Sequence, residues 1–448
     1  MFAKINFHDE FYQKLKLLVL PITMQQFMLA LVSATDAIML GAVSQTSLSA
    51  VSLAGQIQFV LNLFISGISA GSGIMAAQYW GKKDAASIEE VMPIALRTNL
   101  IFSGAFTVFA AVAPEVLMRI FTSDPALIES GAVYLRAVSL SYLLCGISQI
   151  YLILLKNTGY ATVSSRISCT AVVVNIICNA ILIYGLLGLP ALGIQGAAYA
   201  TVAARLVELI WSYLETKQSG RVQIIWKKMF RAADAVLTKD FWRYTTPVLG
   251  AALVWGIAYV SYSVIMGHMG SDAVAANSIT TIAKNMLSCL IRGVSGGAGV
   301  LIGNLLGAGE LDKAKVYGGR LTRMAIVVGM TTGGLLMLIS PLIVRFAPLS
   351  ETAAEYLQYM LIFCGCNIMA QSVNTTVLDG IFCAGGDSKF DMKGNLGAMW
   401  CFSVPFGFFA AFVLKWPVMV VYCIVNLDEI VKIPAVYLHY KKYIWVRN

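Results

Sequence analysis

The sequence contains one long apolar run after another, each about the length needed to cross a lipid bilayer. A helix rises about 1.5 Å per residue and the hydrocarbon layer is roughly 30 Å thick, so a span needs about 20 mostly apolar residues. Of the 448 residues, 58% are hydrophobic and only 12% are charged. A water-soluble core cannot hide this much apolar surface. The chain is therefore predicted to be an all-α, polytopic membrane protein.

Twelve transmembrane helices are expected from the apolar runs and the polar connections between them. They are residues 15–40, 49–77, 92–117, 131–156, 163–186, 191–215, 243–267, 272–302, 317–345, 354–382, 389–413 and 416–439. The connections are short except at a basic segment near the middle of the chain. This segment divides the chain into an N-terminal six-helix lobe at 1–216, a cytoplasmic linker at 217–241 and a C-terminal six-helix lobe at 242–448.

Basic residues are unevenly distributed over this map of spans. Most of the 32 Lys and Arg residues fall on the side that holds both termini, whereas Arg119, Arg345 and Lys415 fall on the opposite side. The positive-inside rule then places both termini in the cytoplasm of a cell whose plasma membrane the chain crosses many times. The net charge of +9 reflects this topology. It indicates contact with membrane lipid head groups, and no nucleic-acid partner is needed to explain it.

The two halves of the sequence repeat each other. Without a gap, Pro21 aligns with Pro247, and several glycines align as well: Gly41 with Gly267, Gly67 with Gly293, Gly71 with Gly297, and Gly81 with Gly307. Because each half has an even number of spans, the copies insert in the same orientation, the parallel repeat of several secondary transporters. Two such lobes can rock and open a central cavity to either side in turn. Duplication for assembly alone is the alternative.

The paired prolines are expected to act as hinges. Pro21 and Pro247 each lack the N–H that would bond to the carbonyl one turn earlier, so each predicts a bend in its helix. A bend that never moves is an equally simple interpretation. The repeated glycines lie within spans and follow no strand, so close helix packing explains them better than a nucleotide loop does.

One acidic residue, Asp36, lies inside the first span. An ionised Asp at mid-bilayer costs about 2.5–3.5 kcal/mol on insertion scales, so it should face a partner or a water-filled space. Such a carboxylate can exchange H⁺ or Na⁺ for substrate, and Asp36 is the one residue at which a metal ion, Na⁺, is expected. A structural acid that is hydrogen-bonded between helices is the alternative interpretation.

Polar and aromatic residues recur at helical spacing in other spans and are expected to line a substrate cavity between the lobes. They are Gln58 and Asn62 in the second span, Trp255, Tyr259 and Tyr262 in the seventh, Lys284 and Arg292 in the eighth, and Asn367, Gln371, Asn374 and Asp379 in the tenth. The aromatic group suits planar or cationic substrates, although ordinary helix packing explains it equally well. Lys284 and Arg292 suit an anionic substrate or neutralise Asp379.

Two sets of charged residues near the inner surface are interpreted as structural pairs. Arg205 lies three residues before Glu208, and Lys432 follows both Asp428 and Glu429 at helical pairing distance. Opposite charges at these spacings lie on one helix face and stabilise the helix.

The sequence resembles the multidrug and toxic compound extrusion (MATE) transporters over nearly its whole length. The two proline helices, TDAIMLG at 35–41, GIQGAA at 193–198 and NLLGAG at 304–309 carry the resemblance. It implies antiport, in which H⁺ or Na⁺ enters as a drug-like small organic molecule leaves. It also implies a cation site made of Asp36, Asn175, Asn179 and Thr201. Asn179 stands where relatives often carry a second Asp, so coupling through Asp36 alone is the hypothesis.

Other classes of function fit less well. A lipid-linked precursor flippase of the same superfamily would use Lys284 and Arg292 to hold a diphosphate, but such flippases usually have extra spans. A channel would need repeated selectivity residues, and none are visible. The three histidines and nine cysteines form neither HExxH nor CxxC, so no enzyme, no catalytic residue and no cofactor beyond the coupling ion is expected. The sequence leaves the oligomeric state open, and a monomer is compatible with all of this.

Overall fold

The computed structural model describes residues 10–122, 124–229, 234–347 and 349–446, and within these ranges the regular structure is entirely helical. Among the described residues, 10 helices are long and apolar enough to cross a membrane. They are α1 (Glu10–Val43), α2 (Gln45–Gly81), α3 (Ala85–Val112), α5 (Pro125–Asn157), α6 (Ala161–Tyr184), α9 (Ala235–Gly267), α10 (Ser271–Gly307), α11 (Leu311–Phe346), α12 (Glu351–Thr375) continued by η2 (Thr376–Phe382), and α13 (Ser388–Asn395) continued by η3 (Leu396–Ser403), α14 (Val404–Phe408) and η4 (Phe409–Val413). The all-α, polytopic fold is confirmed.

The remaining two expected spans have different features. Helix α7 (Ile194–Thr216) carries Arg205, Glu208 and Glu215, which lower its hydropathy. The last expected span is divided at Asn426 and Leu427 into α15 (Val418–Val425) and α16 (Asp428–Tyr440), each too short to cross a bilayer alone. The other elements are short: α4 (Pro114–Arg119), η1 (Leu186–Gly188) and α8 (Trp226–Met229).

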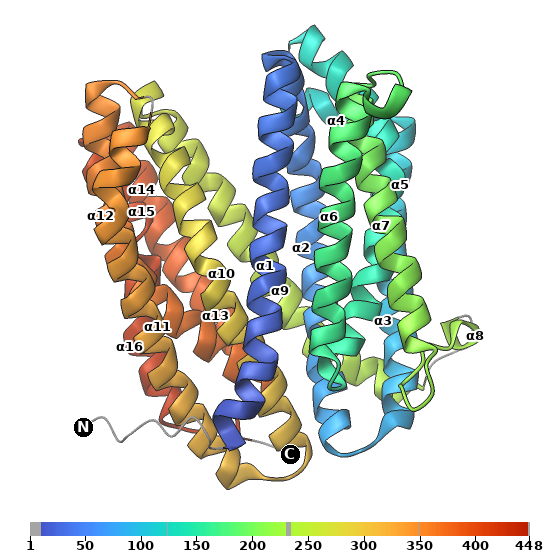
Figure 1. The fold of residues 1–448 in the computed structure, drawn as a ribbon. Helices are drawn as coiled ribbons and strands as arrows, with labels where there is room; N and C mark the ends of the chain where they lie inside the picture. The colour runs from blue at the N-terminus through green and yellow to red at the C-terminus, as the bar shows by residue number, and fades with distance from the viewer. Residues whose placement is uncertain (1–9, 123, 230–233, 348, 447–448) are drawn as a thin grey trace. The chain divides into compact units, whose positions relative to one another are not determined.

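Contacts group the chain into two compact units. Unit 1 contains Met1–Gln26 and Gly250–Asn448, and unit 2 contains Phe27–Leu249. Helices α1 and α9, each drawn as one continuous ribbon in Figure 1, therefore contribute their first part to one unit and the rest to the other. This grouping differs from the sequence partition in where α1 and α9 divide. Of the expected linker at 217–241, residues 230–233 lie outside the described residues.

The repeated glycines mark close helix contacts inside each unit. In unit 2, a Cβ added at Gly67 would lie 2.7 Å from Leu249 Cα on α9, and one at Gly71 would lie 2.5 Å from Thr245 Oγ1. In unit 1, a Cβ added at Gly297 would lie 2.9 Å from Val19 Cγ2 on α1. Such distances leave no room for a side chain. Small residues thus let α2 approach α9, and α10 approach α1, near the proline of each partner helix.

Substituting Gly71 by Val is expected to lower the free energy of unfolding by about 1–3 kcal/mol, because the new side chain overlaps Thr245. Gly55 on the same helix has nothing within 4 Å of an added Cβ, so Gly55→Val is the matched control for helix propensity. Thermal aggregation of the detergent-solubilised proteins measures both. Equal melting temperatures for the two variants would contradict the close packing of α2 on α9.

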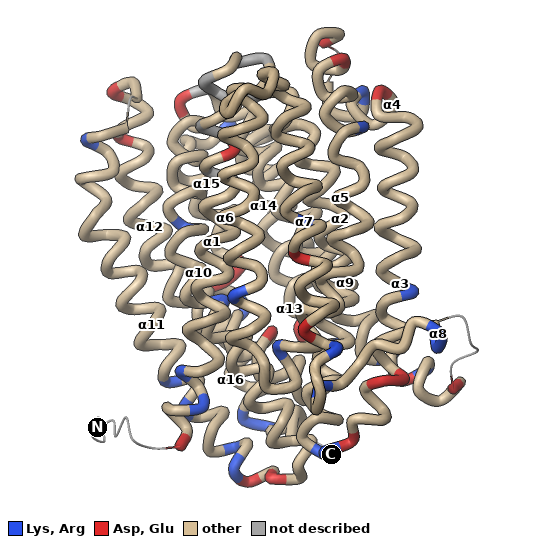
Figure 2. The backbone as a smooth tube through the Cα atoms, turned by 45° about the vertical axis from the view of Figure 1, so that its right-hand side comes forward, with Lys and Arg blue, Asp and Glu red and all other residues tan. Residues whose placement is uncertain are grey.

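The first helix and the C-terminal tail meet at one end of unit 1. Phe11 and Trp445 are both fully buried in the same apolar cluster, together with residues of α10, α11 and η2. Figure 2 shows basic residues gathered near this end, where α10 turns into α11 and where α16 runs toward the C-terminus. An even number of spans is expected to bring the two ends of a chain to the same side of a membrane, and this arrangement fits that expectation.

Candidate functional site

The Asp36 side chain is half-buried on α1 and is hydrogen-bonded to α6. Asn179, which is fully buried, donates from Nδ2 to Asp36 Oδ1 over 2.5 Å. An amide N–H₂ that faces a carboxylate supplies donors to an oxygen that, when ionised, can only accept. The acid in the first span therefore has the intramembrane partner that its position requires.

The hydrogen-bonded chain continues from Asn179 to α7. The same Asn179 Nδ2 lies 3.2 Å from Asn175 Oδ1, one turn earlier on α6, and Asn175 Nδ2 lies 3.5 Å from Thr201 Oγ1. Thr201 in turn donates to the Ala197 carbonyl over 3.0 Å, so its oxygen faces Asn175 as an acceptor. The i, i+4 spacing puts both asparagines on one face of α6. The structure thus brings Asp36, Asn175, Asn179 and Thr201 together in unit 2.

The oxygen side of Asn179 is the unusual feature of this group. Asn179 Oδ1 is buried and has no hydrogen-bond partner among the described residues. A buried acceptor beside a carboxylate is costly unless a proton or a cation is bound there. No group of three or more His, Cys, Asp or Glu residues in the described ranges is arranged to hold a metal ion. Any Na⁺ here would therefore rely on one carboxylate together with amide and hydroxyl oxygens.

Two tyrosines of α5 near this group were not predicted from the sequence. Tyr134 is 8% exposed and lies within electrostatic reach of both Asp36 and Tyr142. The Tyr142 hydroxyl is buried and has no hydrogen-bond partner in the described part of the chain. Their only signal in the sequence is a pair of hydroxyls two turns apart in one span. Nothing in the sequence indicates that α5 brings Tyr134 within electrostatic reach of Asp36.

The predicted cavity residues of α2 and α9 occupy mixed environments. In unit 2, Gln58 is half-buried and Asn62 is exposed. In unit 1, the Trp255 and Tyr259 rings stack with centroids 5.5 Å apart and planes at 17°. Tyr262 packs against an apolar cluster that contains residues of α9, η4 and α15. The stacked pair is partly open, so its faces suit a planar group, whereas Tyr262 belongs largely to the packing of unit 1.

The predicted charged residues of α10 and η2 differ in exposure. Lys284 is half-buried and Arg292 is exposed, and neither forms a salt bridge with another residue in the described ranges. Asp379 is also exposed, in the π-helical turn η2, and lies within electrostatic reach of Arg292. A substrate cavity lined by these three residues stays a prediction.

The asparagines of α12 point into unit 1. Asn367 is 2% exposed and Asn374 is 1% exposed, whereas Gln371 is half-buried. Asn374 Nδ2 donates to the Glu429 carbonyl over 2.6 Å and to Glu429 Oε2 over 2.8 Å. The helical spacing of the three residues predicts a shared face, and at Asn374 that face contacts α16.

The two expected charged pairs are present. Arg205 Nη1 lies 2.5 Å from Glu208 Oε2, and Gln149 donates to the other carboxylate oxygen over 3.2 Å. Lys432 pairs with both acids, since its Nζ lies 3.5 Å from Asp428 Oδ2 and 3.0 Å from Glu429 Oε1. Both structural pairs are confirmed.

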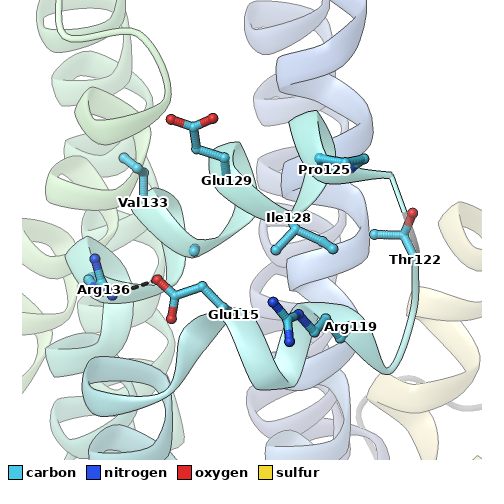
Figure 3. Close-up of a pocket in the computed structure, with 9 residues that line it drawn as sticks. Glu115, Arg119, Thr122, Pro125, Ile128, Glu129, Val133 and Arg136 are labelled. Atoms are coloured by element: carbon cyan, nitrogen blue, oxygen red, sulfur yellow. Dashed lines mark hydrogen bonds and ion pairs between the residues drawn. The ribbon is translucent and has the colours of Figure 1, made fainter.

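A separate hollow lies between α4 and α5, and none of the predicted site residues lines it. Figure 3 shows its charged residues, in which Glu115 and Arg136 form an ion pair of 2.6 Å while Arg119 and Glu129 extend along its sides. The paired side chains are about half-exposed, and exposed ion pairs contribute little energy. The hollow adds nothing to the Asp36 group.

Comparison with known proteins identifies the family. The family model described as MatE matches residues 21–181 and 247–409, one match in each half of the repeat. An uncharacterized transporter, YisQ of Bacillus subtilis (strain 168), is 22% identical over 417 residues, which are 92% of this chain and 90% of YisQ. A probable multidrug resistance protein, NorM of Agrobacterium fabrum, is 24% identical over 354 residues, which are 78% of this chain and 73% of NorM.

Solved structures give the same fold. A MOP superfamily transporter from Pyrococcus furiosus, described as having a binding pocket of reverse polarity that suggests a different function, superposes with a TM-score of 0.87 at 18% identity. The superposition covers 96% of this chain and 95% of that one. The family matches include the motifs at 35–41 and 304–309, whereas the motif at 193–198 lies between the two matched segments. The chain belongs to the MATE family of multi-pass membrane transporters, and it is not an enzyme.

Proposed function

We propose that the protein is an antiporter that exports drug-like organic molecules in exchange for H⁺ or Na⁺. The observation that carries this proposal is the chain from Asp36 through Asn179 and Asn175 to Thr201, with the Asn179 Oδ1 acceptor unpartnered beside the carboxylate. A bound cation satisfies this acceptor and the carboxylate together. When the cation leaves, the Asp36 carboxylate is a buried, uncompensated charge. Its free-energy penalty is relieved only if the helices around it rearrange.

The rearrangement in this proposal is alternating access between two lobes, 1–216 and 242–448, joined by the linker at 217–241. Pro21 and Pro247 are the proposed hinges. Helices α1 and α9 each contribute to both units, and in each helix the boundary between the units lies within two turns after the proline. In this proposal the protein lies in the plasma membrane, and both termini face the cytoplasm. Lipid head groups contact the basic loops.

The proposed substrates are small organic molecules with a planar part. The Trp255 and Tyr259 rings are already stacked and partly open, and relatives such as NorM are named as probable multidrug resistance proteins. Lys284, Arg292 and Asp379 add charges of both signs, which favours zwitterions or anions beside cations. The proposed substrate cavity contains these residues with Gln58, Asn62, Tyr262, Asn367, Gln371 and Asn374. Lys284 and Arg292 also favour the second candidate, a flippase for a lipid-linked diphosphate.

Transport in inverted membrane vesicles tests the proposal. Vesicles with the wild-type protein are expected to accumulate ethidium when a pH gradient or a Na⁺ gradient is imposed, and imposing each gradient alone identifies the coupling ion. Vesicles without the protein are the control. Dye movement that persists after both gradients are collapsed would indicate a channel. Ion-independent movement of a fluorescent diphosphate lipid, lost in Arg292→Gln, would instead favour the flippase.

A further inference from the structure

A second group of charged residues is buried in unit 1 and takes no part in the Asp36 group. It consists of Asp391 and Asn395 on α13, and Asp428, Glu429 and Lys432 on α16, and is called here the Lys432 cluster. The Lys432 side chain is 5% exposed, that of Asp428 8% and that of Glu429 13%. Buried ions at this depth need compensation from their immediate neighbours.

The ammonium of Lys432 sits among oxygen ligands from two helices. Lys432 Nζ lies 3.0 Å from Glu429 Oε1, 3.2 Å from Asn395 Oδ1 and 3.5 Å from Asp428 Oδ2. Two carboxylates and an amide oxygen around one positive charge form the kind of oxygen cage that also binds a small hard cation. The Lys432 ammonium occupies the position that such a cation would take.

A second layer of amides holds the cage in place. Asn374 donates to both the carbonyl and the carboxylate of Glu429, and Asn395 Nδ2 donates to Asp391 Oδ1 over 3.1 Å. Asn374 is 1% exposed, and its Oδ1, on the same amide group that contacts Glu429, has no hydrogen-bond partner in the described ranges. The cage is therefore oriented from α12 and α13 as well as from α16.

The cluster contains more carboxyl groups than ammonium groups. Asp391, Asp428 and Glu429 carry three carboxyl groups, and Lys432 is the one basic residue among them. Outside the cluster, Asp379 lies within electrostatic reach of Asp391, Glu429 and Lys432, while Lys284 acts on Asp428 and Glu429 and Arg292 acts on Asp379. A buried cage with more carboxylates than ammonium groups holds its cation strongly. Removing the ammonium would leave a site that attracts a replacement cation.

We propose that the Lys432 cluster is a monovalent-cation site whose permanent occupant is the ammonium of Lys432. External Na⁺ binds there only when this ammonium is removed. The tethered charge cannot leave with a change of conformation, so the cluster contributes no exchangeable ion to transport. This inference goes beyond the proposed function, because it assigns a resident cation to unit 1 whether or not Asp36 couples transport to an ion.

The test measures Na⁺ binding by the purified full-length protein with Asp36→Asn as the background, which removes the other candidate site. In this background, Lys432→Met is expected to gain Na⁺ binding, from none to about one ion per chain by ²²Na⁺ scintillation. Its melting temperature is expected to rise by about 3 °C in NaCl relative to choline chloride of the same ionic strength. Lys315→Met is the matched control, since Lys315 forms an exposed pair with Asp312, and it should gain neither.

A further variant keeps the test decisive if Lys432→Met accumulates poorly. The double variant Lys432→Met/Glu429→Gln removes one charge of each sign, and it is expected to fold and to show no response to Na⁺. For Lys432→Met alone, methylammonium in the extraction buffer is expected to restore the yield of folded protein. Two results would overturn the proposal. One is Na⁺ binding with Lys432 in place that Glu429→Gln abolishes. The other is a Lys432→Met protein on which Na⁺, Li⁺ and methylammonium have no effect.

Discussion

Vesicles that carry Asp36→Asn are expected to accumulate dye no faster than vesicles without the protein, whichever ion gradient is imposed. The amide is nearly the same size as the carboxylate and still bonds to Asn179, but it has no charge with which to hold H⁺ or Na⁺. Ethidium accumulation in inverted vesicles measures the loss. Because the fold is retained, the melting temperature of the purified variant should stay close to that of the wild type.

Asp312→Asn is the matched control for this substitution. Asp312 is an acid whose side chain is 98% exposed and whose only ion pair in the described ranges is with Lys315. Removing its charge should leave dye accumulation unchanged. Ion-driven export that survives Asp36→Asn at the wild-type rate would remove the carboxylate from the coupling mechanism, while the family assignment would stand.

Substituting Arg205 by Met is expected to destabilise the protein by about 3–5 kcal/mol, the largest stability effect predicted here. Glu208 is 1% exposed, and without Arg205 the neutral Gln149 is its one remaining side-chain partner among the described residues. Thermal aggregation in detergent, compared with the wild type, measures the loss. The destabilisation comes from the orphaned carboxylate rather than from a missing attraction.

The double variant Arg205→Met/Glu208→Gln separates these two causes. Replacing both charges removes the orphaned carboxylate, and the amide that takes its place can still bond to Gln149, so most of the lost stability should return. A double variant as unstable as Arg205→Met alone would show that the arginine stabilises α7 by packing and not by pairing with Glu208.

Much of the fold was predictable because the bilayer restricts a chain so strongly. Long apolar runs can only become helices there, and the ungapped repeat fixes which runs correspond. The division of α1 and α9 between units was not predictable in the same way. Both helices look continuous in the sequence. The contact of Gly297 with Val19 shows that the first half of α1 packs on α10, and the contact of Gly71 with Thr245 shows that the first half of α9 packs on α2.

The parts of the candidate site that could be predicted are those that depend on residue type and spacing within one helix. Asp36 is conspicuous in an apolar run, and the i, i+4 spacing of Asn175 and Asn179 gives them one face. Spacing within a helix does not indicate which other helix or cavity contacts that face. The spacing of Asn367 and Asn374 therefore does not indicate how deeply they are buried in unit 1, and Tyr134 was not predicted although it lies near Asp36.

Ion release on substrate binding tests most directly the claim that the Asp36 carboxylate exchanges a cation for substrate. Purified protein is titrated with ethidium in weakly buffered detergent solution while a pH indicator follows H⁺ and a Na⁺-selective dye follows Na⁺. The wild type should release one of the two ions as ethidium binds, and Asp36→Asn should bind ethidium without releasing either. Equal release from both proteins, or ethidium binding to the wild type with no release of either ion, would contradict the account.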